Sequence, residues 1–287
     1  MITGDPLAPY RTRLLGLAYR MLGDRAEAED VLQDAFIRFT RTRDVENEGA
    51  YLTRTVTRLC LDRLKSARIR RETYVGPWLP DPVLDTGALA PDAATELADD
   101  LSFALLLTLE RLPPSQRAAF LLHDVFGLSF KEVSAILGKS EAACRQLAAR
   151  GRRAVRQDRP GERTSPEAHT RVVHAFTTAI GSGDVAALVQ VLTEDAVLLA
   201  DSGGLRPSAR NPIRGADKIA RLLLAGRRKE AGGGGTFHAE FRPINGMPGI
   251  VTYLGGEPEG TMAFAIERDR ISAIFVTRHP EKLARLQ

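Results

Sequence analysis

Arginine side chains near the middle of this 287-residue chain are its strongest candidates for chemistry. In the helical pattern from Ser140 to Ala154, small and apolar residues repeat on one side, and cationic residues fall nearly opposite. A guanidinium group can bind base edges and phosphates through paired hydrogen bonds. This spacing predicts contact with DNA. The candidate residues are Ser140, Glu141, Arg145, Gln146, Arg152 and Arg153.

Two short helices around a tight turn must position these arginines. Ser129 and Glu132 form a capping box at the start of the first helix, and Gly138 ends it. Upstream, Ser115 is expected to cap a helix that runs through Val125. The pattern predicts a helix-turn-helix whose second helix reads DNA. A helical hairpin with its charged face in water is the alternative that this stretch alone leaves open.

Two helices in the first seventy residues carry faces of opposite charge. Asp24 and Glu27 predict the start of a helix whose outer face is mostly acidic. The next helix, within residues 47–66, exposes a mostly basic face, and residues 54–71 hold seven basic side chains against one acid. A basic block attracts polyanions such as nucleic acid. Two ordinary solvated faces are the alternative.

Three sequence blocks, in a fixed order, resemble one protein family. The region of bacterial extracytoplasmic-function (group IV) sigma factors that binds core polymerase is similar to DRAEAEDVLQDAFIRFTR. The region that melts and reads the −10 promoter element is similar to AYLTRTVTRLCLDRLKSARIRR. The domain that reads the −35 element is similar to LERLPPSQRAAFLLHDVFGLSFKEVSAILGKSEAACRQLAARGRR. The resemblance covers residues 7–156 and implies a protein that positions RNA polymerase and catalyses nothing itself.

The resemblance also implies roles for individual residues. It implies that a positively charged coiled coil of core RNA polymerase is bound by Glu29, Asp30, Gln33, Asp34 and Phe36. It implies that the −10 promoter element is bound by Arg58, Asp62, Arg63, Lys65 and Arg68. Many family members have Asn one residue after the position of Arg58, where this chain has Leu59. It also implies that the six candidate residues of the helix-turn-helix bind the −35 promoter element.

Residues 73–100 predict a flexible acidic linker, since residues 81–110 contain seven acids and no Lys or Arg. Within it the run GPWLPDP combines three prolines with Trp78, the only tryptophan. Prolines stiffen the chain and a large aromatic side chain is costly to expose, so this run predicts a docking peptide. A tryptophan tucked against the core of the first domain is the alternative. The run resembles the tryptophan–leucine–proline–acid–proline motif of the sigma subgroup with a SnoaL-like C-terminal domain.

The last third of the chain begins with helical stretches. Strands are expected near its end, at residues 197–199, 237–241, 250–254, 261–267 and 271–277. Helices followed by antiparallel strands predict an α+β cone, which resembles the SnoaL-like, nuclear-transport-factor-2-like (NTF2-like) fold. The tail HPEKLAR resembles the subgroup's asparagine–proline–acid–lysine motif, and DSGG departs by one residue from its acid-plus-three-glycines turn. The resemblance implies interdomain contacts by Trp78, Leu79, Pro80, Asp81, Pro82, Asp201, Gly203, Gly204, Pro280, Glu281 and Lys282.

Cone folds of this type often hold an apolar pocket, and some relatives are enzymes that use an acid/base pair. The groups that could form such a pair are Asp195, Asp201, His238 and Glu240. Their spacing indicates no dyad, so we predict no enzymatic activity and no cofactor, and leave a small-molecule ligand open as a partner. Cys60, Cys144 and His123 have no partners at metal-ligand spacing, so no metal site is predicted.

The chain is therefore predicted to be multidomain, with a formal net charge of +4. The expected parts are two all-α sigma domains, namely a region 2 helical bundle (1–72) and a region 4 helix-turn-helix domain (101–157), an acidic linker (73–100) between them, and a C-terminal α+β NTF2-like regulatory domain (166–287). Core RNA polymerase and promoter DNA are the expected partners. Without a signal peptide or a membrane-length apolar run, we expect a cytoplasmic protein with no membrane partner. A one-component regulator that senses a small molecule, and a SnoaL-like enzyme fused to a DNA-binding module, stay open as alternatives.

Overall fold

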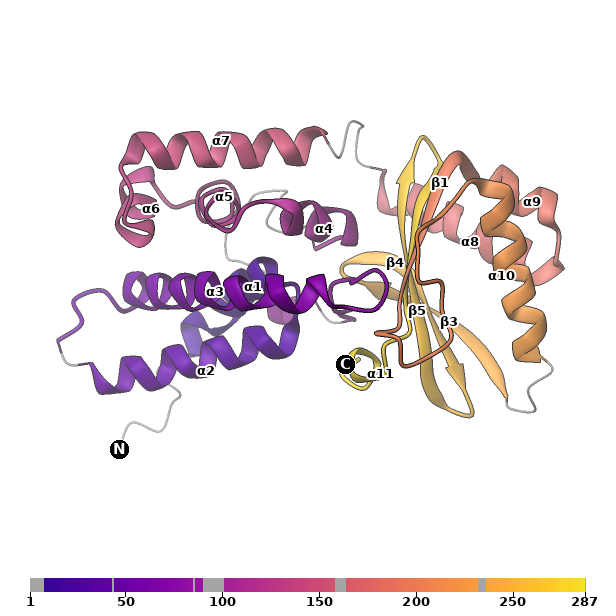
Figure 1. Cartoon of the computed structure of the whole chain (residues 1–287), viewed down its shortest axis with the longest axis horizontal. Helices are drawn as coiled ribbons and strands as arrows, with labels where there is room; N and C mark the ends of the chain where they lie inside the picture. Colours follow the sequence, from indigo (N-terminus) through magenta and orange to yellow (C-terminus); the bar gives the residue numbers. More distant parts are fainter. Residues whose placement is uncertain are drawn as a thin grey trace. The chain divides into compact units, whose positions relative to one another are not determined.

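The computed structural model describes residues 8–42, 44–84, 86–89, 101–157, 164–231 and 236–286. These residues fall into two compact units, which we call the helical unit (within 1–72 and 86–160) and the C-terminal unit (within 73–85 and 161–287). Figure 1 labels their helices and strands. No helix in the described part of the chain is long and apolar enough to cross a membrane.

The helical unit opens with three helices, α1 (Ala8–Leu22), α2 (Arg25–Arg41) and α3 (Glu48–Glu72). Asp24 starts α2 as expected, because its carboxylate accepts a hydrogen bond from the backbone N–H of Glu27 at 2.9 Å. The apolar faces of the three helices pack together. Their fully buried members include Leu17, Tyr19, Met21, Val31, Leu52 and Val56.

The rest of the helical unit is also helical. Its elements are η1 (Gly87–Leu89), α4 (Phe103–Arg111), α5 (Pro114–Phe120), the π turn η2 (Leu121–Val125), α6 (Phe130–Leu137) and α7 (Glu141–Gln157). The last two are the helices of the expected helix-turn-helix, joined by the short turn around Gly138 and Ser140.

The expected helix from Ser115 through Val125 ends at Val125 as predicted, but it starts earlier and its last turn has π geometry. Pro113 is the N-cap and Pro114 is the first helical residue, because proline has no N–H to lose there and its φ angle suits a helix start. The last turn widens to a π turn, in which the backbone N–H of Phe126 donates to the Leu121 carbonyl oxygen at 2.9 Å. All three apolar residues of this turn are buried, so the wider turn is compatible with a tightly packed core.

Buried arginines join the first three helices to the later ones. Arg20 on α1 is 1% exposed, and its Nη1 donates to the Leu89 carbonyl oxygen at 2.9 Å. Arg117 on α5 is 4% exposed and donates to the carbonyl oxygens of Met21 and Glu110. Carbonyl partners offset the desolvation of a buried guanidinium group. Helices of both predicted sigma regions therefore belong to one packed unit.

The C-terminal unit combines helices with one sheet. Its helices are α8 (Pro166–Ser182), α9 (Val185–Gln190), α10 (Ala216–Ala231) and α11 (Pro280–Leu283). Its strands are β1 (Leu192–Asp201), β2 (Ile213–Arg214), β3 (Phe237–Ile244), β4 (Met247–Leu254), β5 (Glu257–Glu267) and β6 (Arg270–Thr277). The strand order is β2-β1-β6-β5-β4-β3.

The α+β class is confirmed, and the last four strands pair antiparallel as expected. Strand β1 runs parallel to β6, with Leu198 opposite Ile274, whereas the other pairs are antiparallel. Strand β1 also begins at Leu192, earlier than expected. A register shift between Leu192 and Val197 and the exposed charges within that stretch interrupt the alternation that would have revealed it. Strand β2 has only two residues, too few for a periodic signal.

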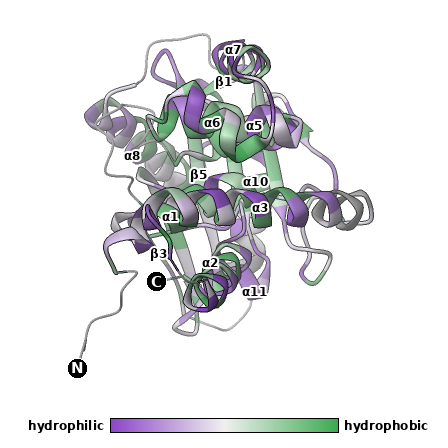
Figure 2. Ribbon diagram, turned by 90° about the vertical axis from the view of Figure 1, so that its left-hand side faces the viewer, coloured by the Kyte–Doolittle hydropathy of each residue, from purple (hydrophilic) through white to green (hydrophobic). Residues whose placement is uncertain are grey.

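Apolar side chains fill the space between the helices of this unit and its sheet. The Phe176 and Phe264 rings meet edge to face, with centroids 5.1 Å apart. Other buried members of this core are Val173, Leu188, Leu198, Ile219 and Ile274. Figure 2 shows the strands of the sheet mostly in the hydrophobic colour. The interior of the expected cone is therefore largely occupied by its own side chains.

The C-terminal unit is expected to lose stability as the pH falls below about 6.5, the ordinary pKa of histidine. Burial lowers the pKa of His169 on α8, whose Nε2–H donates to the Pro248 carbonyl oxygen at 3.1 Å. The unfolded chain therefore binds the proton more readily than the folded chain. Denaturant unfolding of the full chain between about pH 5 and 8 measures this slope. A His169→Gln variant, which keeps a donor but does not titrate, should show a shallower slope, and equal slopes would contradict the assignment.

Candidate functional site

The helix-turn-helix forms as the sequence predicts. The backbone N–H of Ser129 donates to Glu132 Oε2 at 2.8 Å, which completes the capping box of α6. Gly138 ends that helix with a left-handed φ of 64°. Ser140 Oγ then accepts a hydrogen bond from the backbone N–H of Ala143 at 3.2 Å and starts α7. Capped ends fix where α7 begins and hence which side chains share its outer face.

The outer face of α7 is rich in cations. Its exposed polar residues include Glu141, Arg145, Gln146, Arg150, Arg153 and Arg156. Sequence reasoning did not single out Arg150, although helical spacing from Gln146 and Arg153 places it on this face. Arg152 differs from the other predicted residues, because its Nε donates to Asp124 Oδ1 of η2 at 2.6 Å. The structure thus gives Arg152 a partner inside the unit and leaves the other cations at the surface.

Helix α2 presents the predicted polymerase-binding residues. Glu29, Asp30 and Gln33 are exposed, and Phe36 is half-buried. Sequence reasoning missed Ile37, whose side chain is 42% exposed. Ile37 follows Asp30 by seven residues, so it shares a helix face with Asp30 and Gln33. An exposed apolar side chain beside acids is typical of a surface that a protein partner covers.

Arg63 connects the predicted polymerase-binding helix to the predicted −10 helix. Its Nη1 lies 3.5 Å from Asp30 Oδ2, and its Nη2 lies 3.2 Å from Asp34 Oδ2. Arg63 also donates to the Glu27 carbonyl oxygen at 3.3 Å. Both acids are about half exposed or more, so the pairs are screened by water and contribute little stability. The predicted polymerase-binding residues and the predicted −10 residues, which sequence analysis assigned to separate sites, are therefore in contact through Arg63.

The remaining predicted −10 residues lie along α3. Arg58 is exposed, and Lys65 Nζ donates to Asp62 Oδ1 at 2.8 Å on the surface. The side chain of Arg68 lies outside the described residues. The exposed cations of α3 agree with contact to a polyanion but do not by themselves select one sequence.

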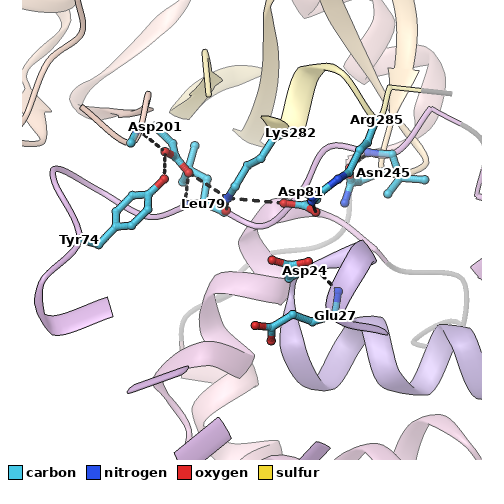
Figure 3. A network of polar contacts seen from close by, with 11 residues as sticks. Asp24, Glu27, Tyr74, Leu79, Asp81, Asp201, Asn245, Lys282 and Arg285 are labelled. Atoms are coloured by element: carbon cyan, nitrogen blue, oxygen red, sulfur yellow. Dashed lines mark hydrogen bonds and ion pairs between the residues drawn. The ribbon is translucent and has the colours of Figure 1, made fainter. Parts of the chain in front are cut away.

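The tryptophan-containing run is part of the C-terminal unit, where residues 73–84 form a segment that we call the strap. Asp201, at the end of β1, is fully buried and holds the strap at two points. Its Oδ1 accepts a hydrogen bond from Tyr74 Oη at 2.6 Å, and its Oδ2 accepts one from the backbone N–H of Leu79 at 2.9 Å. Burial and the hydrogen bond to Asp201 raise the pKa of the Tyr74 phenol well above its ordinary value. Figure 3 shows this network.

The far end of the strap is fixed by a reciprocal pair of hydrogen bonds. Val83 N–H donates to Asn245 Oδ1 at 2.9 Å, and Asn245 N–H donates to the Val83 carbonyl oxygen at 2.7 Å. Asn245 is 1% exposed and adopts φ 53° in the turn between β3 and β4, a conformation that asparagine tolerates better than most residues. Sequence reasoning missed both Tyr74 and Asn245. Only the left-handed Asn-Gly turn signal could have drawn attention to Asn245.

Lys282 on α11 sits at the centre of the strap contacts (Figure 3) and is 6% exposed. Its Nζ lies 3.0 Å from Asp201 Oδ2 and 3.6 Å from Asp81 Oδ1, and it donates to the Leu79 carbonyl oxygen. The same ammonium group lies 4.6 Å from the centre of the Trp78 ring. A single buried cation therefore joins two buried acids, the strap backbone and the tryptophan. Arg285 adds a second cation 4.0 Å from Asp81.

The DSGG turn packs closely against the strap and the tail. A Cβ atom at Gly203 would lie 2.4 Å from the His279 ring, and one at Gly204 would lie 3.0 Å from the Val75 side chain. Both glycines also have positive φ angles. The His279 ring stacks on Tyr74, with centroids 6.4 Å apart. Glycine is therefore required here by both space and backbone conformation.

The predicted interdomain residues are largely brought together around the strap. Trp78, Leu79, Asp81, Asp201, Gly203, Gly204 and Lys282 make the contacts described above, and Pro80 and Pro82 are buried. Pro280 is the first residue of α11, and the Glu281 side chain is exposed.

The four candidate acid/base residues do not form one site. His238 Nε2 lies 3.6 Å from Glu240 Oε1 on an exposed face of β3, and Asp195 is exposed on β1. Asp201 is engaged by the strap and Lys282. An open hollow of about 540 Å³ at the start of α10 contains none of the four. No group of three metal-ligating side chains occurs among the residues that the structure describes.

Comparison with known proteins fits this arrangement. The family model for Sigma-70 region 2 matches residues 7–70, and the model for Sigma-70 region 4 matches residues 102–155. The ECF RNA polymerase sigma factor SigJ of Mycobacterium tuberculosis is 40% identical over 285 residues, which cover 95% of this chain and 90% of SigJ. The probable sigma factor SigI of the same species is 32% identical, with 96% and 92% covered. The crystal structure of M. tuberculosis SigJ superposes with a TM-score of 0.77 and 34% identity, covering 96% of this chain and 95% of that one.

Proposed function

Because the chain belongs to the extracytoplasmic-function family of RNA polymerase sigma factors, we propose that its C-terminal unit controls this activity through the docked strap. As an alternative sigma factor, the protein directs promoter-specific initiation by core RNA polymerase. Region 2 distinguishes it from a one-component repressor, which needs no polymerase-binding helix. The polymerase supplies the chemistry of RNA synthesis, so no catalytic dyad is required of this chain.

In this proposal, three surfaces of the helical unit bind three different targets. The acidic face of α2 with Ile37 binds a positively charged element of core polymerase. The basic face of α3 contacts the −10 element, and α7 enters the major groove at the −35 element. The cytoplasm, where polymerase and promoter DNA meet, is the site of action.

The single observation that carries control in cis is the double anchoring of the strap. The strap directly follows α3 and precedes η1, so it is the covalent link between the −10 helix and the rest of the helical unit. Asp201 and Asn245 hold it near its two ends on the C-terminal unit. Any promoter complex that needs this link to change path must first break these contacts, so docking biases which state is populated.

This mode of control needs no small-molecule ligand. The space between the helices and the sheet of the C-terminal unit is filled by its own apolar side chains, including Phe176 and Phe264. The input is instead whatever shifts the strap between docked and released states, and a shift of a few kcal/mol is sufficient for a switch.

Two truncations test the proposal in run-off transcription with core polymerase. Deleting residues 166–287 removes the whole docking surface, whereas ending the chain before His279 removes the strap contacts of His279, Lys282 and Arg285 but keeps Asp201 and Asn245. Each truncation is expected to change transcript yield per sigma molecule by at least about threefold, and to a different extent, since each leaves a different part of the strap held. Yields equal to that of the full chain in both truncations would overturn control in cis.

A further inference from the structure

We propose that the π turn η2 and Phe130 position the DNA-reading arginine of α7, which makes His123 and Phe130 specificity-determining residues that need not touch DNA. The inference rests on the proposed role of α7 in −35 recognition. Long arginine side chains lose considerable rotamer entropy when they bind, so a side chain held in its binding conformation beforehand binds with less loss.

Arg145 is held on two sides and is still reachable. Its guanidinium carbon lies 5.7 Å from the centre of the Phe130 ring, within the range of a cation–π contact. Its Nη1 lies 3.4 Å from Glu141 Oε2, one helical turn earlier. The side chain is 55% exposed, so these contacts restrict the arginine without covering it.

His123 in turn fixes the Phe130 ring. The two rings stack with centroids 3.8 Å apart and an interplanar angle of 27°. The His123 ring is itself oriented, because its Nδ1–H donates to the Leu128 carbonyl oxygen at 2.8 Å. A continuous stack of histidine, phenylalanine and arginine therefore connects η2 to the exposed face of α7.

The neighbouring residue of the same turn anchors α7 at a second point. Asp124, whose side chain is 12% exposed, pairs with Arg152 at 2.6 Å. Arg152 lies seven residues after Arg145, close to two helical turns, so the two arginines lie on nearly the same side of α7. Gly151 permits the close approach beside this anchor, since a Cβ there would lie 2.8 Å from Phe120 Cβ.

His123 and Asp124 are neighbours in one π turn, and their side chains reach different partners, Phe130 and Arg152. A π turn accommodates one extra residue compared with an α-helical turn, and each residue rotates a side chain by about 100°. The turn is closed by hydrogen bonds from Phe126 N–H to Leu121 and from Leu128 N–H to Leu122, each 2.9 Å long.

Selection from a promoter library with a randomised −35 element tests the inference with holoenzyme assembled from the full chain and core polymerase. An Arg145→Ala variant should relax the base preference at the position that Arg145 reads. A Phe130→Leu variant should relax the preference at that same position, by about two- to fivefold, the value of an exposed cation–π contact. A Phe130→Tyr variant keeps an aromatic ring and should retain the preference.

The double variant Phe130→Leu, Arg145→Ala separates positioning from folding. We expect it to select like Arg145→Ala alone, because without the arginine the ring has nothing to position. An equal additional loss in the double variant, or a Phe130→Leu variant that binds all sequences more weakly with unchanged preference, would overturn the inference. If the parent holoenzyme selects no −35 sequence at all, it is the proposed function that fails.

Discussion

Replacing Asp201 by Ala is expected to release the strap and strongly destabilise the C-terminal unit. The carboxylate of Asp201 is fully buried and bound by Tyr74, the Leu79 backbone N–H and Lys282. Removing it leaves a nearly buried ammonium group with one acid fewer, and breaking a buried ion pair in this way costs about 3–5 kcal/mol. Hydrogen exchange at the backbone N–H of Leu79, together with denaturant unfolding of the full chain, measures the effect.

The matched control is Asp217→Ala in the same unit. Asp217 pairs with Arg221 at 2.8 Å on the exposed surface of α10, where water screens the pair and it contributes little to stability. A second variant, Asp201→Ala with Lys282→Met, removes the cation that the first change leaves behind, and should lose less stability than the two single changes added together. If Asp201→Ala behaves like Asp217→Ala, the strap is not held by this network.

Reversing the charges of Asp30 and Asp34 is expected to abolish co-purification with core polymerase and transcription from any promoter. Like charges placed against a positively charged partner cost several kcal/mol, which exceeds what the rest of a transient interface can offset. The fold should persist, because among the described residues the change breaks only the exposed pairs with Arg63, each worth less than about 1 kcal/mol. Pull-down of core polymerase and a thermal melt of each variant are the measurements.

The control carries the same change in net charge elsewhere on the helical unit. Glu46→Lys with Glu48→Lys alters two exposed acids outside the predicted interface, one just before α3 and one at its first residue. It should bind polymerase like the parent chain. Loss of binding in both double variants would indicate an effect of net charge and count against the α2 interface. An Ile37→Ser variant should weaken binding without any change in charge, because Ile37 is exposed beside Asp30.

The strap is the short segment of chain through which changes in the C-terminal unit can affect the helical unit. The strap leads directly from the end of α3, so contacts made by Asp201 and Lys282 act on the path between α3 and the helix-turn-helix. Gly203, Gly204 and the left-handed Asn245 let the turns around the strap pack closely against it. Control of a sigma factor in cis then requires only a segment with two states, one docked and one released.

Local sequence signals determined the helix-turn-helix and the secondary structure around it. The capping box of Ser129 with Glu132, the left-handed Gly138 and the cap at Asp24 each involve residues within a few positions of one another. Their hydrogen bonds close within one helical turn, so they form wherever the chain is helical. Helical periodicity likewise determined which side of α7 is polar. The class of the C-terminal unit followed from the order of helices and strands.

Only the tertiary structure decided which charged groups meet. It paired Arg63 with Asp34 and Arg152 with Asp124, although the patterns that contain these two arginines equally suit DNA or solvent, and it joined Lys282 to Asp201. It also placed Trp78 and its neighbours on the C-terminal unit, turned the end of α5 into a π turn, and set β1 beside β6. The physical reason is that a charge or an aromatic ring binds whatever packing brings within a few ångströms. Those neighbours come from residues tens to hundreds of positions away, which no local pattern encodes.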